Sequence, residues 1–498
     1  MLESHSLRHP AVTVLSFTGM RATIRSPQAL GLASLALLAA CNALTGAGDL
    51  TVSPCDGCEE SESGIRVDGA VVEDGQGPGP GSDGSTDGPA GDTAKEGLGG
   101  TLDPTFGTGG FVVIDPLVDP HAVAVRSDGR IVVVGATSNA LAAAAFTPSG
   151  AVDLTFGTAG RVIKGQGTSS IGSAVAFDSQ GRTVVGGTSI VVLTTAVHYT
   201  YVVRIGASQL DATFSNNGAY RGNSGEDGRG VVVTANDAIV VASSGGNDYR
   251  FQRLTVDGGP DLTFGNMGFA SFANVGGEPT CLIAQVDGFV SAGTGNGPTG
   301  QSLTATKLSL LGQPVNAFGS LGKAVSKVGP NNNETGQSVA AQADGKILIG
   351  GDYDPNVGNI RRVSVATRLT SSGQVDATYA TAGKFVLDLS DPLIGKETDT
   401  TNTNLVLDSS GRALVVGNVH DRLNGGGDRF RGWVARLRVD GTLDPLFGTQ
   451  GKLVIGTAPA QFVVRGAALQ PDGKLVVVGV DNNANKLFLA RIITSTTM

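Results

Sequence analysis

Five acidic side chains recur along the sequence in a similar setting, a few residues before an apolar, strand-like stretch. They are Asp119, Glu226, Glu278, Glu334 and Glu397. Carboxylate oxygens are the ligands that Ca²⁺ prefers in proteins, so acids brought together by a fold would hold a cation. The same residues would also serve to cap turns or to keep a rim hydrated. Both interpretations stay open from the sequence, and Ca²⁺ is the one cofactor that the residues suggest.

Other residues that could carry chemistry are few. Only His121, His198 and His420 follow the first hundred residues, and none has the spacing of a helical metal site. Nucleophile-elbow, phosphate-loop and dinucleotide motifs are not found in a fitting context. A pair of carboxylates for glycoside cleavage stays open, because two such residues can meet only in space. One tryptophan, Trp433, and six tyrosines are few for a carbohydrate-binding groove.

A ten-residue pattern, first written "LDPTFGTGGF" from Leu102, occurs seven times. Its aromatic anchors are Phe106, Phe156, Phe214, Phe264, Phe318, Tyr379 and Phe447. Six copies carry an aspartate, at Asp103, Asp153, Asp211, Asp261, Asp376 and Asp444. An aspartate in a turn can accept a hydrogen bond from the backbone two residues on, and a residue needed once per repeat usually serves the repeat. We therefore expect a structural role for these aspartates.

Basic residues recur in the strand that precedes the pattern. They are Arg204, Arg253, Lys307, Arg368, Arg436 and Arg491. We expect them to pair with the repeated aspartates or to contact a neighbouring repeat, and to be structural as well.

The elements that position these residues are short strands. Between the aromatic anchors lies an apolar strand, a polar-Gly turn and a second apolar strand, as in "AVAVRSDGRIVVVG" from Ala122, which is a hairpin signal. A third strand such as "VARL" and a fourth such as "GKLV" complete each unit. The 75 glycines and the low share of charged residues, 16%, suit many short strands joined by tight turns. Four antiparallel strands repeated about every 57 residues are typical of a β-propeller blade.

The "DxTFGxxG" turn and the "QxDGKIxVxG" hairpin resemble the bacterial delta-60 repeat family, over residues 102–493. The resemblance implies a propeller-like, mostly extracytoplasmic protein and no known catalytic chemistry. Two copies depart from the pattern: Val315 stands where the fifth aspartate would be, and the third hairpin reads "AND" before Ala238. We interpret these as divergent blades of the same fold.

The sequence predicts an all-β fold, a seven-bladed β-propeller of four-stranded antiparallel blades, in residues 101–498. The first turn precedes any hairpin, and the last hairpin and third strand are not followed by a turn. We therefore expect residues 110–114 to pair as the outermost strand of the last blade, which contains Leu475–Gly479 and Leu487–Ile492. Closure of this kind would remove two exposed sheet edges.

The N-terminal region is predicted to be a signal peptide, residues 1–40, with Met20 as the expected true start. Arg21 and Arg25 precede the apolar run "ALGLASLALL", which is too short to span a bilayer and is followed by "LAAC". This ending resembles the lipobox of bacterial lipoproteins. The resemblance implies that Cys41 becomes the lipidated N-terminus of an exported protein, anchored in the outer membrane or at the cell surface. A plain signal peptide with an incidental cysteine is the alternative.

Residues 41–100 are expected to be an acidic linker, disordered because Gly, Pro, Asp and Ser leave too few apolar residues to offset ordering entropy. Cys55 and Cys58 in "PCDGC" are disulfide candidates, since no second pair of ligands nearby suggests zinc. Cys281, in an apolar strand, is expected to be a buried free thiol.

Charge and composition favour one of two classes of function. Most of the net charge of −9 comes from the linker, so the repeats are nearly neutral and lack the basic surface of a nucleic-acid-binding protein. The favoured hypothesis is a lipid-anchored, non-catalytic propeller that binds a protein, glycan or matrix component at the cell envelope. The alternative is a propeller enzyme, a hydrolase or lyase, with carboxylates at the mouth of its channel.

Overall fold

The computed structural model describes residues 99–329, 333–355, 358, 360–389, 395–423, 425–456 and 461–495, with only the backbone described at 395 and 396. They all belong to one compact unit, residues 36–498, and the other unit, residues 1–35, lies outside the described residues. Cys41, Cys55, Cys58 and the expected linker up to residue 98 also lie outside them. Every element in the described part is a strand, and no helix there could cross a membrane.

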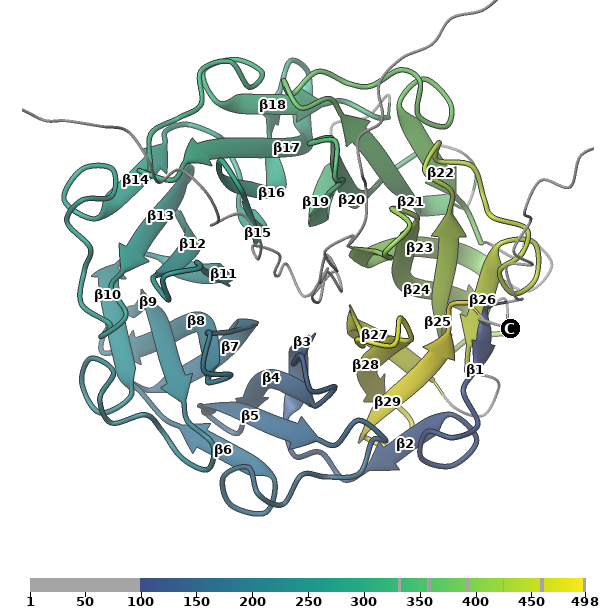
Figure 1. Cartoon of the computed structure of the whole chain (residues 1–498). Coiled ribbons are helices and arrows are strands. Elements are labelled where there is room, and N and C mark those ends of the chain that lie inside the picture. The colour runs from purple at the N-terminus through teal and green to yellow at the C-terminus, as the bar shows by residue number, and fades with distance from the viewer. Residues whose placement is uncertain are drawn as a thin grey trace, which may run out of the picture. The chain divides into compact units, whose positions relative to one another are not determined.

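The strands repeat in groups of four, and each group is an antiparallel meander that runs from the centre of the ring to its edge (Figure 1). The innermost strands are β3 (Asp119–Val125), β7 (Ser169–Phe177), β11 (Asp227–Val233), β15 (Pro279–Gln285), β19 (Glu334–Ala341), β23 (Gly395–Leu407) and β27 (Phe462–Leu469). The second strands are β4 (Ile131–Thr137), β8 (Thr183–Val192), β12 (Ile239–Gly245), β16 (Gly288–Gly297), β20 (Ile347–Tyr353), β24 (Ala413–Leu423) and β28 (Leu475–Asp481).

The third strands are β5 (Ala140–Phe146), β9 (Ala196–Ile205), β13 (Asp248–Leu254), β17 (Gly300–Ser309), β21 (Ile360–Leu369), β25 (Asp428–Leu437) and β29 (Lys486–Ile493). The outermost strands are β6 (Arg161–Lys164), β10 (Ala219–Ser224), β14 (Phe269–Phe272), β18 (Lys323–Ser326), β22 (Lys384–Leu387), β26 (Lys452–Ile455) and, for the last group, β2 (Phe111–Ile114). The predicted all-β propeller architecture of four-stranded antiparallel sheets is therefore confirmed.

One pair of groups is joined into an eight-stranded sheet. Strand β21 pairs in parallel with β23 through Ile360 with Thr398 and Arg362 with Asp399, which connects β19–β22 to β23–β26. The described strands thus form six sheets. A count of seven blades treats the two antiparallel halves of this sheet separately.

The predicted closure is present. Strand β2 pairs antiparallel with β29, with Phe111 opposite Ala490 and Ile114 opposite Leu487. The short strand β1 (Thr101–Leu102) also pairs with β29, one turn earlier in the chain. Segments from both ends of the described chain therefore share one sheet, and the last group has its outermost strand from the N-terminal side.

Residues just before β1 were expected to be linker, and the structure corrects this boundary. Gly99 and Gly100 are buried, and Gly100 donates a backbone hydrogen bond to Ile493 at 2.7 Å. In the preceding group the corresponding bond runs from Gly441 to Arg438 at 2.9 Å, and both glycines have positive φ, +83° and +88°. The turn that follows β29 is thus assembled from the two ends of the described chain, and the folded region includes residues 99 and 100.

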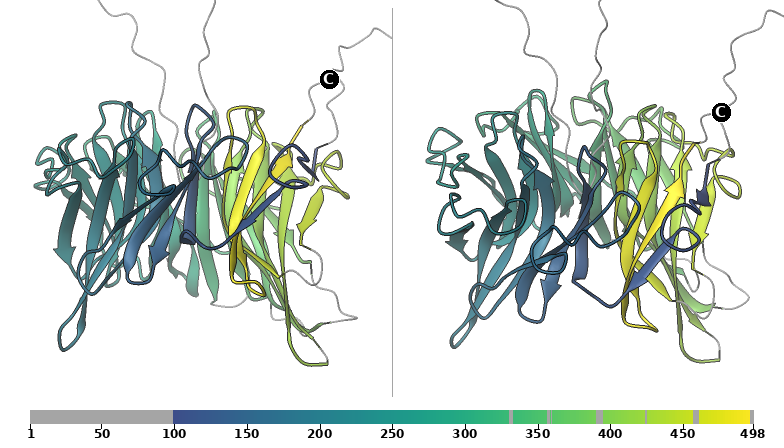
Figure 2. Two further views of the ribbon diagram at one scale, coloured as in Figure 1. Left: turned by 90° about the horizontal axis from the view of Figure 1, so that it is seen from below. Right: turned by 60° about the horizontal axis from the view of Figure 1, so that its bottom comes forward.

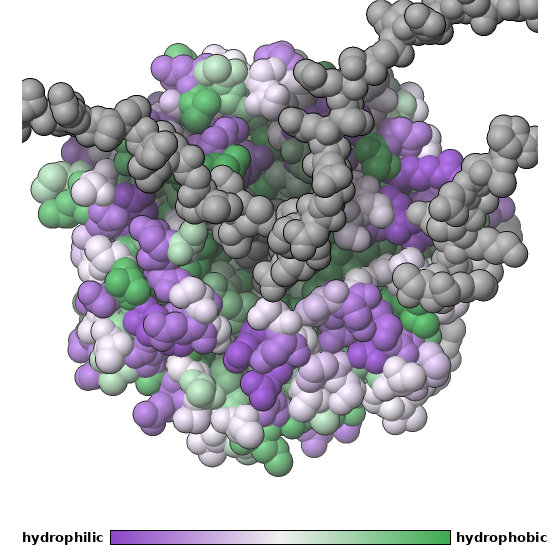
Figure 3. Space-filling model, viewed as in Figure 1, coloured by the Kyte–Doolittle hydropathy of each residue, from purple (hydrophilic) through white to green (hydrophobic). Residues whose placement is uncertain are grey.

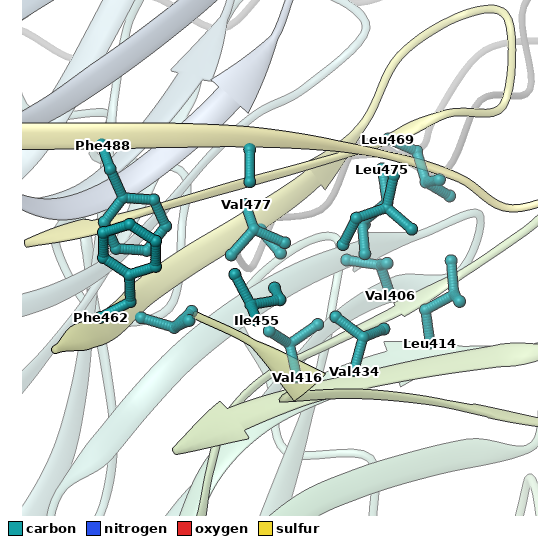
Figure 4. Packing of buried hydrophobic residues seen from close by; sticks show 14 of the residues in the cluster. Val406, Leu414, Val416, Val434, Ile455, Phe462, Leu469, Leu475, Val477 and Phe488 are labelled. Atoms are coloured by element: carbon teal, nitrogen blue, oxygen red, sulfur yellow. The ribbon is translucent and has the colours of Figure 1, made fainter. Parts of the chain in front are cut away.

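The core lies between the sheets. Each of the hydrophobic clusters found in the described residues joins two consecutive groups, and one of them packs Val123 and Val133 of the first group against Val476 and Leu489 of the last. Figure 4 shows another, in which Val416 and Val434 meet Val477 of the next group. Because both faces of the second strands are covered, several of these strands contain continuous apolar runs that do not alternate with polar residues, such as Ile131–Val134 in β4 and Leu475–Val478 in β28.

The two faces of the ring are built from different connections. The hairpins between second and third strands lie on one face, and the β24–β25 hairpin projects there at the lower edge of Figure 2. The repeated turns and β1, in dark blue, lie toward the opposite face at the upper edge. Figure 3 shows that second face, where polar residues are interspersed with apolar ones. Leu154, Leu262 and Met267 of the repeated turns are among the exposed apolar residues.

Candidate functional site

The repeated aspartates fix their own turns. The carboxylate of Asp103 accepts hydrogen bonds from the backbone N–H and the hydroxyl of Thr105 at 3.0 and 2.7 Å. The other five aspartates accept the same backbone bond from the residue two positions on. Burial raises the pKa of Asp103, but hydrogen bonds from Thr105 and Lys474 and the charge of Arg491 outweigh it and lower the pKa to about 2.

The repeated arginines bind these aspartates within their own sheet. The N···O distances are 2.7–2.9 Å for Arg204–Asp211, Arg253–Asp261, Arg368–Asp376, Arg436–Asp444 and Arg491–Asp103. Each guanidinium also lies over the aromatic anchor of the same turn, 4.5–5.1 Å from the ring centroid. Each arginine therefore makes an ion pair with the aspartate and a cation–π contact with the aromatic ring of the same turn, and both interactions are attractive.

The same arginines also connect each sheet to the next. A guanidinium nitrogen donates to a backbone carbonyl in the following group, at 2.5 Å for Arg204 to Val256 and 2.7 Å for Arg491 to Pro148. Arg253, Arg368 and Arg436 make equivalent bonds to Leu310, Val439 and Thr494. Both expected roles of the arginines, pairing with the aspartates and contact with a neighbour, therefore occur together.

Among the described residues, two of the contacts between consecutive groups lack this arginine bridge. Lys307 has no aspartate in its turn, because Val315 replaces it, and it binds Asp287 of the β15–β16 hairpin at 2.8 Å. In the first group, Ala145 of β5 lies opposite Val132, the second residue of β4. Arg204 lies in the same way opposite Val184, the second residue of β8, so Ala145 occupies the position of the repeated arginine. The missing side chain leaves a cavity of about 110 Å³, and Arg126 and Arg130 line it beside Asp153.

The third hairpin, between β11 and β12, keeps the turn geometry of five other hairpins despite its different sequence. Asp237 has φ +61° where those five have glycine, such as Gly129 at +83° and Gly473 at +80°. Aspartate tolerates the left-handed region better than most residues because its short side chain bonds locally. The β15–β16 hairpin differs, because Gln285 pairs directly with Gly288 across a two-residue turn.

Four of the five acids that suggested a cation site are each paired with an arginine or a lysine, and the fifth, Asp119, has a histidine as its neighbour. Glu226 is buried and binds Arg250 at 3.3 Å, and Glu278 binds Arg229 at 2.6 Å. Glu334 is fully buried and binds Lys327 at 2.9 Å, and its Oε1 also accepts bonds from the backbone N–H groups of 328 and 329. Asp119 lies 3.8 Å from His121.

Glu397 is the fifth of these acids and binds two arginines. Its Oε2 lies 3.1 Å from Arg361 Nη1 and 3.0 Å from Arg422 Nη1. The hydrogen bond from Arg361 is the largest influence that lowers the pKa of Glu397. In the described part of the chain, no three His, Cys, Asp or Glu side chains gather in a way that could hold a metal ion. The Ca²⁺ hypothesis stays a prediction with weaker geometric support.

A candidate binding site is a polar cavity of about 430 Å³ beside Glu397, where β21 and β23 pair. It is lined by Asn333, Asp354, Gly358, Ile360, Arg361, Arg362, Asp399 and Arg422. These residues come from the starts of β19, β21 and β23, the end of β24 and the β20–β21 connection. They lie at the face of the second-to-third-strand hairpins, away from the repeated turns.

Contacts beneath the cavity hold its arginines in place. Arg362 binds the buried Asp352 and Thr335 Oγ1, the latter at 2.8 Å. Burial raises the pKa of Asp352, although the charge of Arg362 acts against this. Arg422 lies 3.8 Å from Asp399, whose other neighbour is His420 at 3.8 Å. His420 in turn stacks on Phe430 with 4.2 Å between ring centroids.

Sequence reasoning found Glu397, which pairs with two arginines of this site, and missed the residues that line the cavity itself. Arg361, Arg362 and Arg422 belong to strand positions that carry no repeated signal, so nothing in the spacing marks them. The one signal in the sequence that could have marked them is that these three arginines lie outside the repeated pattern. Cys281 is a buried free thiol as expected.

Comparison with known proteins supports a propeller-repeat family. Residues 126–156, 342–379 and 470–492 match the family described as "Domain of unknown function (DUF5122) beta-propeller". Each of these segments contains the second strand of a group and all or nearly all of its third strand. A search of the curated proteins found no similar sequence.

Several solved structures are similar in fold. A catalytically inactive virginiamycin B lyase from Staphylococcus aureus with quinupristin is 11% identical, over 77% of this chain and 98% of that one, with a TM-score of 0.44. The C-terminal WD40 domain of Sif2 is 9% identical over 80% and 99%, with a TM-score of 0.43. Sqt1 from Chaetomium thermophilum is 12% identical over 77% and 98%, with a TM-score of 0.40. At these identities the likeness concerns the fold alone.

Proposed function

We propose that this chain is a lipid-anchored, non-catalytic β-propeller of the bacterial envelope that binds a protein, glycan or matrix ligand in the polar cavity between β21 and β23. One observation carries the proposal: the cavity is lined by residues that are not part of the repeat. The repeated Asp, Arg and aromatic residues are occupied in holding turns and junctions. The cavity residues instead present charged groups at a surface hollow of ligand size.

The location at the envelope rests on the sequence alone. A basic stretch, a short apolar run and "LAAC" ending at Cys41 support export and lipidation. The acidic, Gly- and Pro-rich residues that follow support a tether between membrane and propeller.

A cavity-blocking variant tests the binding function. Ile360 lines the cavity at the start of β21, so Ile360→Trp would fill it with a bulky ring. Leu193→Trp is the matched control, because Leu193 is 84% exposed at the β8–β9 hairpin of the same face. Full chain purified after export is applied to arrays of glycans and peptides and to solubilised matrix. Binding that is lost in Ile360→Trp and kept in Leu193→Trp supports the proposal.

Two outcomes would count against it. Ligands that bind both variants equally would place recognition elsewhere on the molecule. Turnover of a glycan or ester substrate, abolished by Asp399→Asn, would favour the hydrolase or lyase alternative. The proposed function requires no cofactor, so removal of divalent cations with EDTA should leave binding unchanged.

A further inference from the structure

Glu397 binds two arginines of the cavity through its carboxylate, and the carboxylate or sulfate of a ligand could make the same contacts. A single carboxylate oxygen, Oε2, contacts Nη1 of both Arg361 and Arg422. The three side chains are all partly exposed, at 36% for Glu397, 55% for Arg361 and 38% for Arg422. Because exposed ion pairs contribute little to stability, exchange of one carboxylate for another would cost little.

The arginines retain capacity for a ligand. A guanidinium carries five N–H donors in a planar fork that matches carboxylate and sulfate groups. In the described part of the chain, the side-chain contacts of Arg361 involve Nη1 only, and so do those of Arg422. Arg362 differs, since its Nε and Nη2 are engaged by Asp352, Thr335 and the Asn333 carbonyl. Arg361 and Arg422 are therefore the pair available to an oxyanion.

The rest of the lining suits a sugar. Asp399 and Asn333 add hydrogen-bond acceptors to the arginine donors, and sugar hydroxyls need both. Among the described residues that line the cavity, Ile360 is the single large apolar one, whereas peptide partners usually bury apolar or aromatic anchors. Asp352, Asp354, Asp399 and Glu397 surround the three arginines, so a dense polyanion would be repelled. An anionic group spaced by neutral, hydroxyl-rich units fits better.

Resting on the proposed function, we infer that the cavity binds an acidic saccharide whose carboxylate or sulfate replaces Glu397 on Arg361 and Arg422. Glu397 then acts as an internal competitor that the ligand displaces. The same geometry makes binding sensitive to ionic strength, because the contacts are partly exposed to solvent.

Binding of defined oligosaccharides tests this inference. The full chain, purified after export and kept in detergent, is titrated calorimetrically with tetrasaccharides of alternating glucuronate and N-acetylglucosamine. Sulfated forms of the same tetrasaccharide distinguish carboxylate from sulfate recognition, neutral chitotetraose is the uncharged control, and inorganic sulfate tests the anion alone. Arg361→Gln and Arg422→Gln should each weaken binding of an acidic form about tenfold or more, since each removes charge-assisted bonds.

The informative variant is Glu397→Gln, which keeps the shape of the side chain and should tighten binding a few-fold by freeing both arginines. The Arg229–Glu278 pair provides matched controls, because it has the same chemistry at the start of another group, 2.6 Å apart, and does not line this cavity. Arg229→Gln and Glu278→Gln should leave the affinity unchanged, and melting curves of all variants report whether the fold is kept.

Three results would overturn the inference. The first is equal binding of the neutral and the acidic tetrasaccharides. The second is weaker binding by Glu397→Gln, as expected of the arginine variants. The third is binding of an acidic peptide in place of a saccharide, with that binding lost in Ile360→Trp. The last two leave the cavity as a binding site, whereas a ligand insensitive to Ile360→Trp would remove the proposed function itself.

Discussion

The carboxylate of Asp103 lies 2.9 Å from the guanidinium of Arg491, so an ion pair at the edge of β1 joins the two ends of the described chain. Four other groups contain the same pair within one continuous segment. In the last group the aspartate comes from the N-terminal side and the arginine from β29. This pair therefore contributes to closure of the ring as well as to its own turn.

Protonation of Asp103 should weaken that closure. Its pKa is about 2 in the folded protein and 3.8 as an ordinary aspartate, so it contributes stability above pH 4 that is lost as the pH falls toward 2. The shift corresponds to roughly 2 kcal/mol. Asp103→Asn should lower the melting temperature at pH 7 and flatten its decline between pH 4 and pH 2. Equal acid sensitivity of variant and wild type would contradict this role.

Truncation from the N-terminal side should destabilise the last sheet in steps. Removal of residues 1–98 is expected to leave the melting temperature unchanged. Removal through Gly100, which the sequence alone predicts to be harmless, should weaken the split turn because it deletes the bonds to Ile493 and Leu446. Removal through Ile114 also deletes β2 and exposes the edge of β29. Hydrogen exchange of β28 and β29 in the three proteins measures the effect, and unchanged protection after the longest truncation would contradict the observed pairing.

An arginine introduced at Ala145 should stabilise the protein only when the neighbouring positive charge of Arg126 is removed. In the last group, Gln470 Oε1 lies 3.3 Å from Arg491, whereas the first group has Arg126 at the position of Gln470. Ala145→Arg alone would place two guanidinium groups together and should not stabilise the protein. In an Arg126→Gln background the same change should raise stability by about 1 kcal/mol. A double-mutant cycle on melting curves measures this coupling, and a value near zero would show that the two positions are independent.

Lipidation can be tested at Cys41. Cys41→Ser should move the protein from the membrane to the soluble fraction, because each buried acyl CH₂ contributes about 0.8 kcal/mol to anchoring. Metabolic labelling with an alkyne fatty acid followed by fractionation is the measurement. Cys281→Ser serves as the control, since that thiol is buried in β15. Label that persists in Cys41→Ser would contradict the assignment.

The sequence by itself determined the local elements and their order. The polar-Gly turns, the "DxTFG" pattern and the apolar strands depend on neighbours within a few residues, so they predict hairpins and four-stranded groups. The order of these elements along the chain also predicts that residues 110–114 pair with the last sheet. The repeated Asp103 and its equivalents could be assigned a structural role because the bond that they make is local.

Tertiary structure alone decided what happens between the groups. The carbonyls that receive Arg204 and Arg491 lie in the next sheet around the ring, and no spacing in the sequence encodes that contact. The boundary at Gly99 was missed for the same reason, since two glycines look like linker until Ile493 is placed beside them. The polar cavity unites β19, β21, β23 and β24, and its arginines become a site only because β21 and β23 pair across two groups. Long-range packing brings such residues together, and the sequence records each of them only as an isolated charge.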